Sequence, residues 1–565
     1  MRRKANASKS CLLLATLAVT ALVPRDWPVP RDAPLQAQDS SCLVTTANGP
    51  VQGVRREASC TYLGIPFGAP PVGALRWRPP QPRAPWSPTI LSATVAPMAC
   101  AQINLAGAVA GTEDCLTVNI WTPAARVSAR GGPVLVWLHP GGFVAASSNL
   151  AASDGRRFAE ETGTVVVAAN YRLGPFGFLS LRRLIDEDPG YRSAGNYGLA
   201  DQRAALQWVR ANISAFGGDP DNVTLAGTSA GGISTGLHLV SPASRGLVQR
   251  AIVQSGSPTT RLPSAVENEV QGAAFAAALE CPDNAGQLAC LRAKTPGQVL
   301  MALPLAGLTG GLQTFGEQPG RVTWGPIVDG VELPDQPREL FRRGLLSRIP
   351  LVIGSNRDDG WTFVDRSFPA GLDVLQYERA VQTEFGMDAA AILRTYPASS
   401  FPTPKDALAR LATDVEYACE VRRLARAMHA DGAPVYVYSF EYAIDAVIPG
   451  RAFHGLEPNL LFGNNFGAPS NHVLTNQDLA LFRSMSTYWR QFADTGSPNA
   501  RDNPTQWPPF RALPWVDPYD PLRSDRYLRL DRLLTEDEYL RDSQCNFWEP
   551  FFFRTIVGAV PAAAR

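Results

Sequence analysis

Short apolar segments that alternate with longer helical stretches set the strongest limit on how this chain can fold. Several of these segments are apolar at every position, which is typical of strands buried on both faces of a sheet. They lie at residues 133–138, 164–169, 223–226, 251–254, 349–353 and 435–440. Segments between them, such as 201–211, and the later segment 476–492 have helical character. The alternation predicts an α/β fold with a mostly parallel sheet flanked by helices on both faces.

Length and composition are consistent with one large domain. The chain has 565 residues, of which 45% are hydrophobic and 18% charged, which is enough apolar material for a sizeable core. Although length alone suggests several domains, α/β folds often run long as a single unit. Residues 43–62 are punctuated by glycine and predict antiparallel hairpins added at one edge of the sheet. We expect a single domain over residues 39–565.

The charge balance gives no sign of a polyanionic partner. Lys and Arg total 52 against 51 Asp and Glu, for a formal net charge of +1, and no sustained basic stripe is present. Because surfaces that bind nucleic acid or acidic membranes need clustered positive charge, neither partner is expected. No pattern in the sequence indicates an oligomeric state.

The N-terminus has the features of an export signal. Three basic residues within positions 1–4 precede an apolar run at 12–23, which Pro24 ends, and a stretch rich in Pro, Arg and Asp follows to about residue 38. The run is shorter than the roughly 20 residues that a membrane-spanning helix needs, and its position after a basic start favours export over a buried core helix. We expect residues 1–38 to be signal peptide and Pro-rich segment, without a clear cleavage site. The protein is then secreted or periplasmic, with no stable membrane anchor.

The cysteine count fits export. Nine cysteines are present, and Cys11 falls inside the predicted signal. The remaining eight are Cys42, Cys60, Cys100, Cys115, Cys281, Cys290, Cys419 and Cys545. An even number in an exported protein predicts disulfides, and the paired short spacing of a zinc site is missing, so no metal is expected. Eight cysteines allow about a hundred pairings, so spacing alone leaves the connectivity open.

The strongest chemical signal is the sequence Gly-Thr-Ser-Ala-Gly at residues 227–231, directly after the strand-like segment 223–226. In the order strand, tight turn, helix, this G-x-S-x-G pattern raises the serine hydroxyl above the edge of the sheet. The N-terminus of the following helix then points its amides at developing negative charge. A chance run of small residues is the alternative, but the preceding strand favours Ser229 as a nucleophile.

A serine nucleophile needs a base, and the chain offers five histidines. His238 and His429 lie in apolar helix-like stretches, where a structural histidine is the more common role. His472 lies in a polar loop with no evident partner. His454 follows a predicted strand in a loop, from which a side chain can reach the edge of the sheet. We therefore predict His454 as the general base.

The acid is expected between the serine and the histidine, because this fold runs in the order Ser, Asp or Glu, His. The predicted strand 349–353 is followed by Asp358 and Asp359. Either carboxylate could hold the imidazole in the required tautomer and offset its positive charge. The chemistry alone leaves both open.

A glycine-rich turn follows the first predicted strand. The sequence His-Pro-Gly-Gly-Phe at residues 139–143 is a variant of the H-G-G-G motif that supplies oxyanion-hole amides in lipases and esterases. An ordinary turn is the alternative. Its place two strands before the serine favours the oxyanion role.

Together these motifs resemble the type-B carboxylesterases, the family that includes the cholinesterases, from about Val44 to Phe552. The matching segments are 62–67, 70–77, 113–121, 170–178, 195–202 and 216–220, with Trp489, 496–499 and 507–508 near the end. The resemblance implies an α/β-hydrolase fold and hydrolysis of carboxylic esters by a serine mechanism without a cofactor.

The resemblance also assigns residues. It implies Asp359 as the acid, since the family's acid, more often Glu, immediately precedes a glycine. It implies the amides of Gly141, Gly142 and Ala230 as the oxyanion hole. It implies the disulfides Cys100–Cys115, Cys281–Cys290 and Cys419–Cys545, which leaves Cys42–Cys60 to join the N-terminal hairpin. With Asp359 as the acid, an Asn at Asp358 is expected to cost little.

Two departures from the family pattern bear on the substrate. Thr228 stands where many relatives carry Glu, and the segment between Cys100 and Cys115 contains no Trp over which a quaternary ammonium could bind. We therefore expect small-molecule esters that are neutral or apolar, and not choline esters. The alternatives are a lipase for long-chain esters and a catalytically silent adhesion domain. Since all three triad positions hold competent residues, the silent alternative is disfavoured.

Overall fold

A computed structural model describes residues 42–557, apart from 105–106, 125–127, 257, 304–323, 468, 502, 504 and 512–524. The predicted signal peptide and Pro-rich segment, residues 1–38, lie outside the described residues. Among the helices of the described ranges, none is long and apolar enough to cross a membrane.

The fold is organised around a sheet of eleven described strands in the order β16-β15-β14-β13-β12-β11-β9-β10-β8-β4-β3. The pairs from β10 through β9, β11, β12, β13 and β14 to β15 are parallel. Antiparallel strands close the two ends of the sheet. The strands are β3 (Val54–Arg55), β4 (Ser59–Pro66), β8 (Thr117–Pro123), β9 (Gly132–Leu138), β10 (Val165–Ala169), β11 (Gly218–Thr228), β12 (Arg250–Gln254), β13 (Leu351–Asn356), β14 (Val435–Phe440), β15 (Arg526–Leu530) and β16 (Thr535–Glu538).

All six predicted strands are present, as β9 to β14, and the predicted mostly parallel sheet is confirmed. The N-terminal hairpins are also present, as β1 (Leu43–Thr46) with β2 (Gly49–Gln52) and β3 with β4. The strands β1 and β2 form a separate small sheet with β5 (Leu91–Ser92), and β6 (Gln102–Ile103) pairs with β7 (Val109–Ala110).

Alternate residues of the central strands are buried on opposite faces of the sheet. In β9, Val134 and Val136 belong to one core cluster, whereas Leu135 and Trp137 belong to another. Helices α4, α5 and α14 supply apolar side chains to the face of the sheet that carries Val134 and Val136. Helices α1, α15 and α16 supply them to the opposite face. This double burial explains why the strands are apolar at every position.

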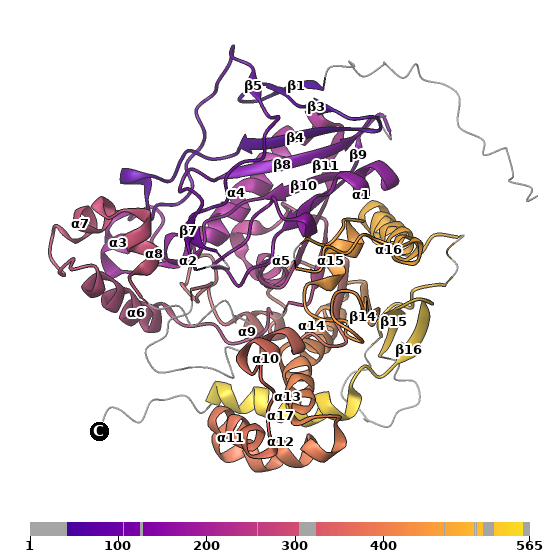
Figure 1. Ribbon diagram of the computed structural model, residues 1–565. Helices are drawn as coiled ribbons and strands as arrows, with labels where there is room; N and C mark the ends of the chain where they lie inside the picture. Colours follow the sequence, from indigo (N-terminus) through magenta and orange to yellow (C-terminus); the bar gives the residue numbers. More distant parts are fainter. Residues whose placement is uncertain are drawn as a thin grey trace, which may run out of the picture. The chain divides into compact units, whose positions relative to one another are not determined.

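The helices cover both faces and extend beyond the sheet (Figure 1). They are α1 (Arg156–Thr162), α2 (Gly174–Phe178), α3 (Arg182–Glu187), α4 (Tyr197–Asn212), α5 (Ala230–Val240), α6 (Ala265–Ala278), α7 (Gln287–Ala293), α8 (Pro296–Met301), α9 (Pro337–Arg342), α10 (Trp361–Ser367), α11 (Val374–Phe385), α12 (Ala389–Thr395), α13 (Pro404–Thr413), α14 (Cys419–Ala430), α15 (Leu456–Leu461), α16 (Asn476–Thr495) and α17 (Asp542–Val557).

A group of helices with its own apolar cluster packs beside the acid-bearing segment. Helices α10 to α13 and α17 lie together at the bottom of Figure 1, and their side chains share one buried cluster. A π-helical turn, Asp414–Ala418, joins α13 to α14. The disulfide Cys419–Cys545 ties α14 to α17 across 126 residues of sequence.

The structure joins the eight described cysteines in the four expected pairs. Cys100–Cys115, Cys281–Cys290 and Cys42–Cys60 close short loops of 15, 9 and 18 residues. The last of these joins the residue just before β1 to β4 of the large sheet, so it fixes the first hairpin to the edge of the domain.

Candidate functional site

Neighbouring parallel strands bring the predicted catalytic residues to one edge of the sheet. Strands β11, β12, β13 and β14 are consecutive in the sheet, so their carboxyl ends meet at that edge. Ser229 follows β11, Asp359 follows β13, and His454 lies in the segment between β14 and α15. Ligands in open α/β sheets bind outside the carboxyl ends of the strands, which makes this edge the candidate active site.

Ser229 occupies a strained turn between β11 and α5. Its backbone has φ 57° and ψ −123°, a conformation that residues with a side chain rarely adopt. The surrounding glycines make the turn possible because the backbone passes too closely for a side chain. A Cβ on Gly231 would lie 2.0 Å from the carbonyl oxygen of Leu138, and one on Gly227 would lie 2.5 Å from the backbone of Gly231. The predicted strand, turn and helix around Ser229 are therefore present.

Asp359 and His454 form a direct hydrogen bond. The Nδ1 atom of His454 lies 2.8 Å from Oδ1 of Asp359, although 95 residues separate them in sequence. Asp359 is fully buried, and the side chain of His454 is 10% exposed. A buried carboxylate on Nδ1 favours the tautomer that leaves Nε2 able to accept a proton, as a general base requires.

The second oxygen of Asp359 is held by two further donors. The Ser255 hydroxyl donates to Oδ2 at 3.0 Å and the Asn356 backbone N–H at 2.7 Å. Ser255 immediately follows Gln254, whose carbonyl oxygen accepts the Ser229 N–H at 3.0 Å. A short hydrogen-bonded path therefore runs from the serine turn through the end of β12 to the acid, which fixes the carboxylate relative to the serine.

The other ring nitrogen of His454 has no hydrogen-bond partner among the described residues. Its Nε2 is buried and makes no hydrogen bond with any described residue, so the structure does not contain a Ser229–His454 hydrogen bond. The imidazole lies against the rings of Phe363 and Tyr417, at centroid distances of 5.0 and 5.1 Å. These two rings limit how the imidazole can tilt. The serine–histidine contact of such sites is often long without substrate and tightens on binding.

The predicted oxyanion turn follows β9. Gly141 and Gly142 have φ 116° and 60°, and a Cβ on Gly141 would lie 2.1 Å from the carbonyl oxygen of Ala145. Neither glycine donates a backbone hydrogen bond to a described residue. Ala230 is the first residue of α5, where a backbone N–H has no partner inside the helix. Three N–H groups are thus available in the segments that the sequence predicted.

The preceding histidine supports the turn. His139 is fully buried, stacks on Tyr171 at 4.3 Å between ring centroids, and its carbonyl oxygen accepts the Tyr171 hydroxyl at 2.8 Å. Burial lowers the pKa of His139 to about 4, so the ring is neutral at ordinary pH. Its role is to hold the turn rather than to exchange protons.

Two other histidines have structural partners. His238 contacts the Ser244 hydroxyl at 2.8 Å and Gln202 at 3.0 Å, and burial lowers its pKa to about 3. The expectation that His472 has no partner is wrong, because its Nε2 lies 3.0 Å from Oδ2 of Asp478 in the first turn of α16. Neither histidine shares an interaction with Asp359.

Asp358 lies beside the acid but makes different contacts. Its carboxylate accepts the backbone N–H of Ala452 at 3.1 Å and contacts arginine side chains. The geometry therefore separates the two adjacent acids: Asp359 contacts the imidazole, and Asp358 contacts the backbone of the segment that carries it.

Sequence reasoning missed several residues around the site. Glu457, one turn after His454, is fully buried, and burial raises its pKa to about 8, with Tyr438 and Gln254 lowering it in part. Ser255, Phe363 and Tyr417 were also missed. Ser255 directly follows a buried strand, and this position could have marked it as a candidate site residue. No local sequence pattern marks Tyr417, which lies in a π-helical turn. Among the described residues, no group of three or more His, Cys, Asp or Glu could hold a metal ion.

Comparison with known proteins identifies the family. The model of the carboxylesterase family matches residues 40–548. A curated relative, fumonisin B1 esterase of Sphingopyxis macrogoltabida, is 36% identical over 489 residues, which cover 84% of this chain and 86% of the relative. The chain therefore belongs to the carboxylesterase family, with its α/β-hydrolase fold, and is a carboxylic ester hydrolase.

Proposed function

We propose that the protein hydrolyses esters through an acyl-enzyme intermediate on Ser229, with His454 as general base and acid and Asp359 as its partner. The Ser229 hydroxyl attacks the ester carbonyl while His454 Nε2 takes its proton. The tetrahedral oxyanion accepts hydrogen bonds from the amides of Gly141, Gly142 and Ala230. The protonated imidazole then gives its proton to the leaving alcohol. Water attacks the acyl-enzyme carbonyl while His454 takes its proton, and the imidazolium returns this proton to Ser229 Oγ as the bond to Oγ breaks and the carboxylic acid leaves.

One observation carries this proposal. The imidazole of His454 has Nδ1 bonded to Asp359 at 2.8 Å, and its Nε2 bonds to no residue that the structure describes, at the edge where the strained Ser229 turn ends β11. His238, in contrast, has a partner for each ring nitrogen. The unpaired Nε2 is consistent with a nitrogen that receives a proton during the reaction.

The test compares two serines near the same helix. Ser229→Ala is expected to abolish hydrolysis of a p-nitrophenyl ester while the circular dichroism spectrum stays unchanged. Ser234→Ala is the matched control, since Ser234 is buried in α5 and accepts a hydrogen bond from Gln202 at 3.0 Å. Substantial turnover by folded Ser229→Ala, or equal losses in both variants, would exclude the serine mechanism.

We further propose neutral or apolar carboxylic esters as substrates, and not choline esters. Thr228 stands beside the nucleophile without a negative charge, and the segment from Cys100 to Cys115 offers no Trp for a quaternary ammonium. Activity on p-nitrophenyl esters of short and long acyl chains would distinguish this substrate class from the lipase alternative. Butyrylthiocholine hydrolysis at a rate comparable with a neutral thioester would contradict the proposed range.

A second candidate substrate is fumonisin B1, because the relative that matches 84% of this chain is a fumonisin B1 esterase. Incubation of the purified protein with fumonisin B1, followed by mass spectrometry, would detect ester cleavage as the release of an acid. Intact fumonisin B1 after prolonged incubation, with a simple ester hydrolysed in parallel, would exclude it.

We also propose that residues 39–565 form one exported domain and that residues 1–38 are a signal peptide followed by a Pro-rich segment. Four disulfides among the described residues support an oxidising compartment. Mass spectrometry of the protein from the exported fraction should find an N-terminus that lacks the apolar run at 12–23. Full-length protein confined to the cytoplasm would contradict export.

A further inference from the structure

Two segments carry the acid and the histidine of the site: residues 356–360, here the acid segment, and residues 450–454, here the histidine segment. Backbone and side-chain hydrogen bonds join them. The Asp358 N–H donates to the Ala452 carbonyl oxygen at 3.0 Å, and the Ala452 N–H returns to the Asp358 carboxylate at 3.1 Å. The Asn356 side chain donates to the Phe453 carbonyl oxygen at 2.7 Å. Ala452 and Phe453 directly precede the histidine, so these bonds fix the point from which its side chain starts.

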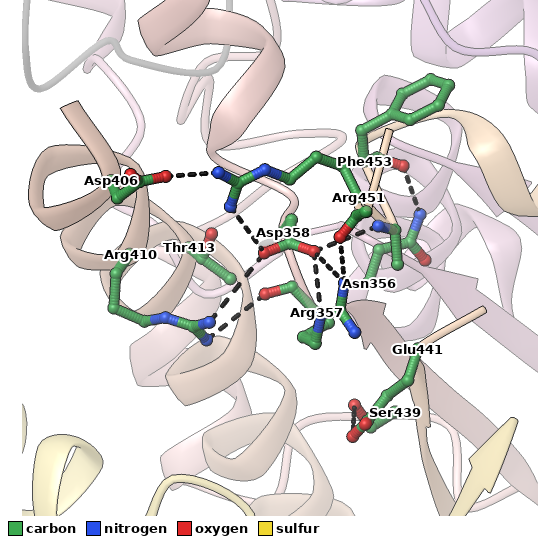
Figure 2. Close-up of polar contacts among 12 residues, drawn as sticks. Asn356, Arg357, Asp358, Asp406, Arg410, Thr413, Ser439, Glu441, Arg451 and Phe453 are labelled. Atoms are coloured by element: carbon green, nitrogen blue, oxygen red, sulfur yellow. Dashed lines mark hydrogen bonds and ion pairs between the residues drawn. The ribbon is translucent and has the colours of Figure 1, made fainter. Parts of the chain in front are cut away.

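The Asp358 carboxylate is the centre of these contacts (Figure 2). Its side chain is only 8% exposed, and three guanidinium groups surround it, those of Arg357 at 2.9 Å, Arg451 at 3.6 Å and Arg410 at 3.9 Å. The arginine exposures are 32%, 28% and 22% in that order, so the cluster is shielded but not dry. One buried carboxylate beside the triad is thus shared by three guanidinium groups, of which that of Arg451 also pairs with Asp406.

Arg357 and Arg451 also contact residues other than Asp358. Arg357 donates to the Gly450 carbonyl oxygen at 2.6 Å, at the start of the histidine segment. Arg451 pairs with Asp406 in the first turn of α13 and lies over the ring of Trp361 at 4.0 Å. Figure 2 shows these side chains converging on the Asp358 carboxylate from the histidine segment, the acid segment and α13.

Helix α13 is itself fitted against the acid turn. Arg410 donates to the Arg357 carbonyl oxygen at 3.3 Å, and the Gly360 N–H donates to the Thr413 hydroxyl at 2.9 Å. A Cβ on Gly360 would lie 2.5 Å from the Ala409 carbonyl oxygen, so the helix and the turn meet without space between them. The arginine cluster is therefore packed against a helix and a turn that are in direct contact with each other.

We propose that Asp358 is a positioning residue, which with its three arginines holds the histidine segment so that His454 Nε2 reaches Ser229. The inference rests on the proposed serine mechanism. Asp358→Asn keeps the shape of the side chain but removes the charge and turns one acceptor oxygen into a donor facing guanidinium groups. Arg357 and Arg410 then lose the carboxylate that they share, Arg451 keeps only its pair with Asp406, and the Ala452 N–H loses a charged acceptor. This revises the expectation that Asp358→Asn costs little.

The experiment compares Asp358→Asn with Asp525→Asn. Asp525 is a matched control because it is 2% exposed and accepts hydrogen bonds from Arg422 at 3.0 Å and Arg426 at 2.9 Å, both of which lie on α14. For each variant, kcat and KM on a p-nitrophenyl ester, the rate of inactivation by a phosphonate and the melting temperature are measured. A structural role lowers the melting temperature of both variants and leaves kcat of the folded protein unchanged.

Asp358→Asn is expected to lower kcat and the phosphonate inactivation rate together by about 10- to 100-fold, with KM within about threefold of wild type. Asp525→Asn is expected to keep both rates at the wild-type level. A folded Asp358→Asn with wild-type kcat, or an equal loss in Asp525→Asn, would overturn the proposal.

A second pair of variants keeps the proposal testable where Asp358→Asn fails to fold. Arg451→Met keeps the contact with Trp361 but removes the charge, whereas Arg451→Lys retains the charge. The expectation is a lower kcat for the Met variant with substantial rescue by Lys, and equal wild-type rates in both would refute it. Ser229→Ala measured in parallel separates the two failures, since a fully active Ser229→Ala refutes the serine mechanism itself.

Discussion

Replacement of Glu457 by Gln should change how the free energy of unfolding depends on pH. Burial raises the pKa of this carboxyl from 4.5 to about 8 in the folded protein. Below about pH 4.5 both the folded and the unfolded chain carry the proton. Between the two pKa values the unfolded chain loses the proton while the folded protein keeps it, so stability falls as pH rises.

The size of this effect follows from the shift. Each unit corresponds to about 1.4 kcal/mol, so this one group removes about 3 kcal/mol of stability by pH 7 and about 5 kcal/mol above pH 8. Gln carries no charge at any pH, so Glu457→Gln lacks this loss. For a domain of about 500 residues, 3 kcal/mol corresponds to a change of about 3 °C in melting temperature.

Scanning calorimetry of both proteins at several pH values between about 4.5 and 8 measures the difference directly, because all other groups titrate alike in the two. The melting temperature of the variant relative to wild type should rise by about 3 °C from the lowest pH to pH 7. Glu378→Gln, which changes an exposed glutamate on α11, is the control and should show a constant difference. Parallel curves for Glu457→Gln and wild type would refute the reasoning.

Further predictions concern the triad and the cysteines. His454→Ala should lower kcat by about 10⁴-fold or more, as Ser229→Ala does, because triad members act as a unit; unequal losses of several orders would contradict a shared role. Asp359→Asn should lower kcat/KM by several orders of magnitude through the wrong imidazole tautomer, and Asp359→Glu should retain part of the activity. An active Asp359→Asn in simple ester hydrolysis would remove that residue from the triad. Thiol titration of the denatured, unreduced exported protein should find none of the eight mature cysteines free, and two or more free thiols would contradict the four disulfides.

The parts of the fold that sequence predicts best are those that leave a recognisable pattern in neighbouring residues of the chain. A strand buried on both faces must be apolar at every position, so β9 to β14 were visible as apolar runs. The serine turn was visible because the close backbone approaches at Gly227 and Gly231 exclude any side chain. In both cases the residues that meet the requirement are neighbours in the chain, even though the contact itself, such as that of Gly231 with Leu138, can be with a distant strand.

What escaped prediction depends on contacts between distant segments. The Ser255 hydroxyl supports Asp359 across 104 residues, and Arg451 reaches Asp358 from the histidine segment 93 residues later. Tyr417 approaches His454 only because the π-helical turn between α13 and α14 packs on the acid segment. No local pattern encodes such neighbours, which is also why chemistry alone left Asp358 and Asp359 both open until the resemblance chose between them.

The most direct measurement of the proposed mechanism is the site of covalent modification by a phosphonate ester, read by tandem mass spectrometry of the peptides. Such reagents react with a serine activated by a base and held beside an oxyanion hole. One phosphonate per chain on Ser229, formed at a rate that falls in parallel with kcat in His454→Ala and Asp359→Asn, is the predicted result. Complete inactivation with the adduct on a different residue, or full activity after stoichiometric labelling of Ser229, would contradict it.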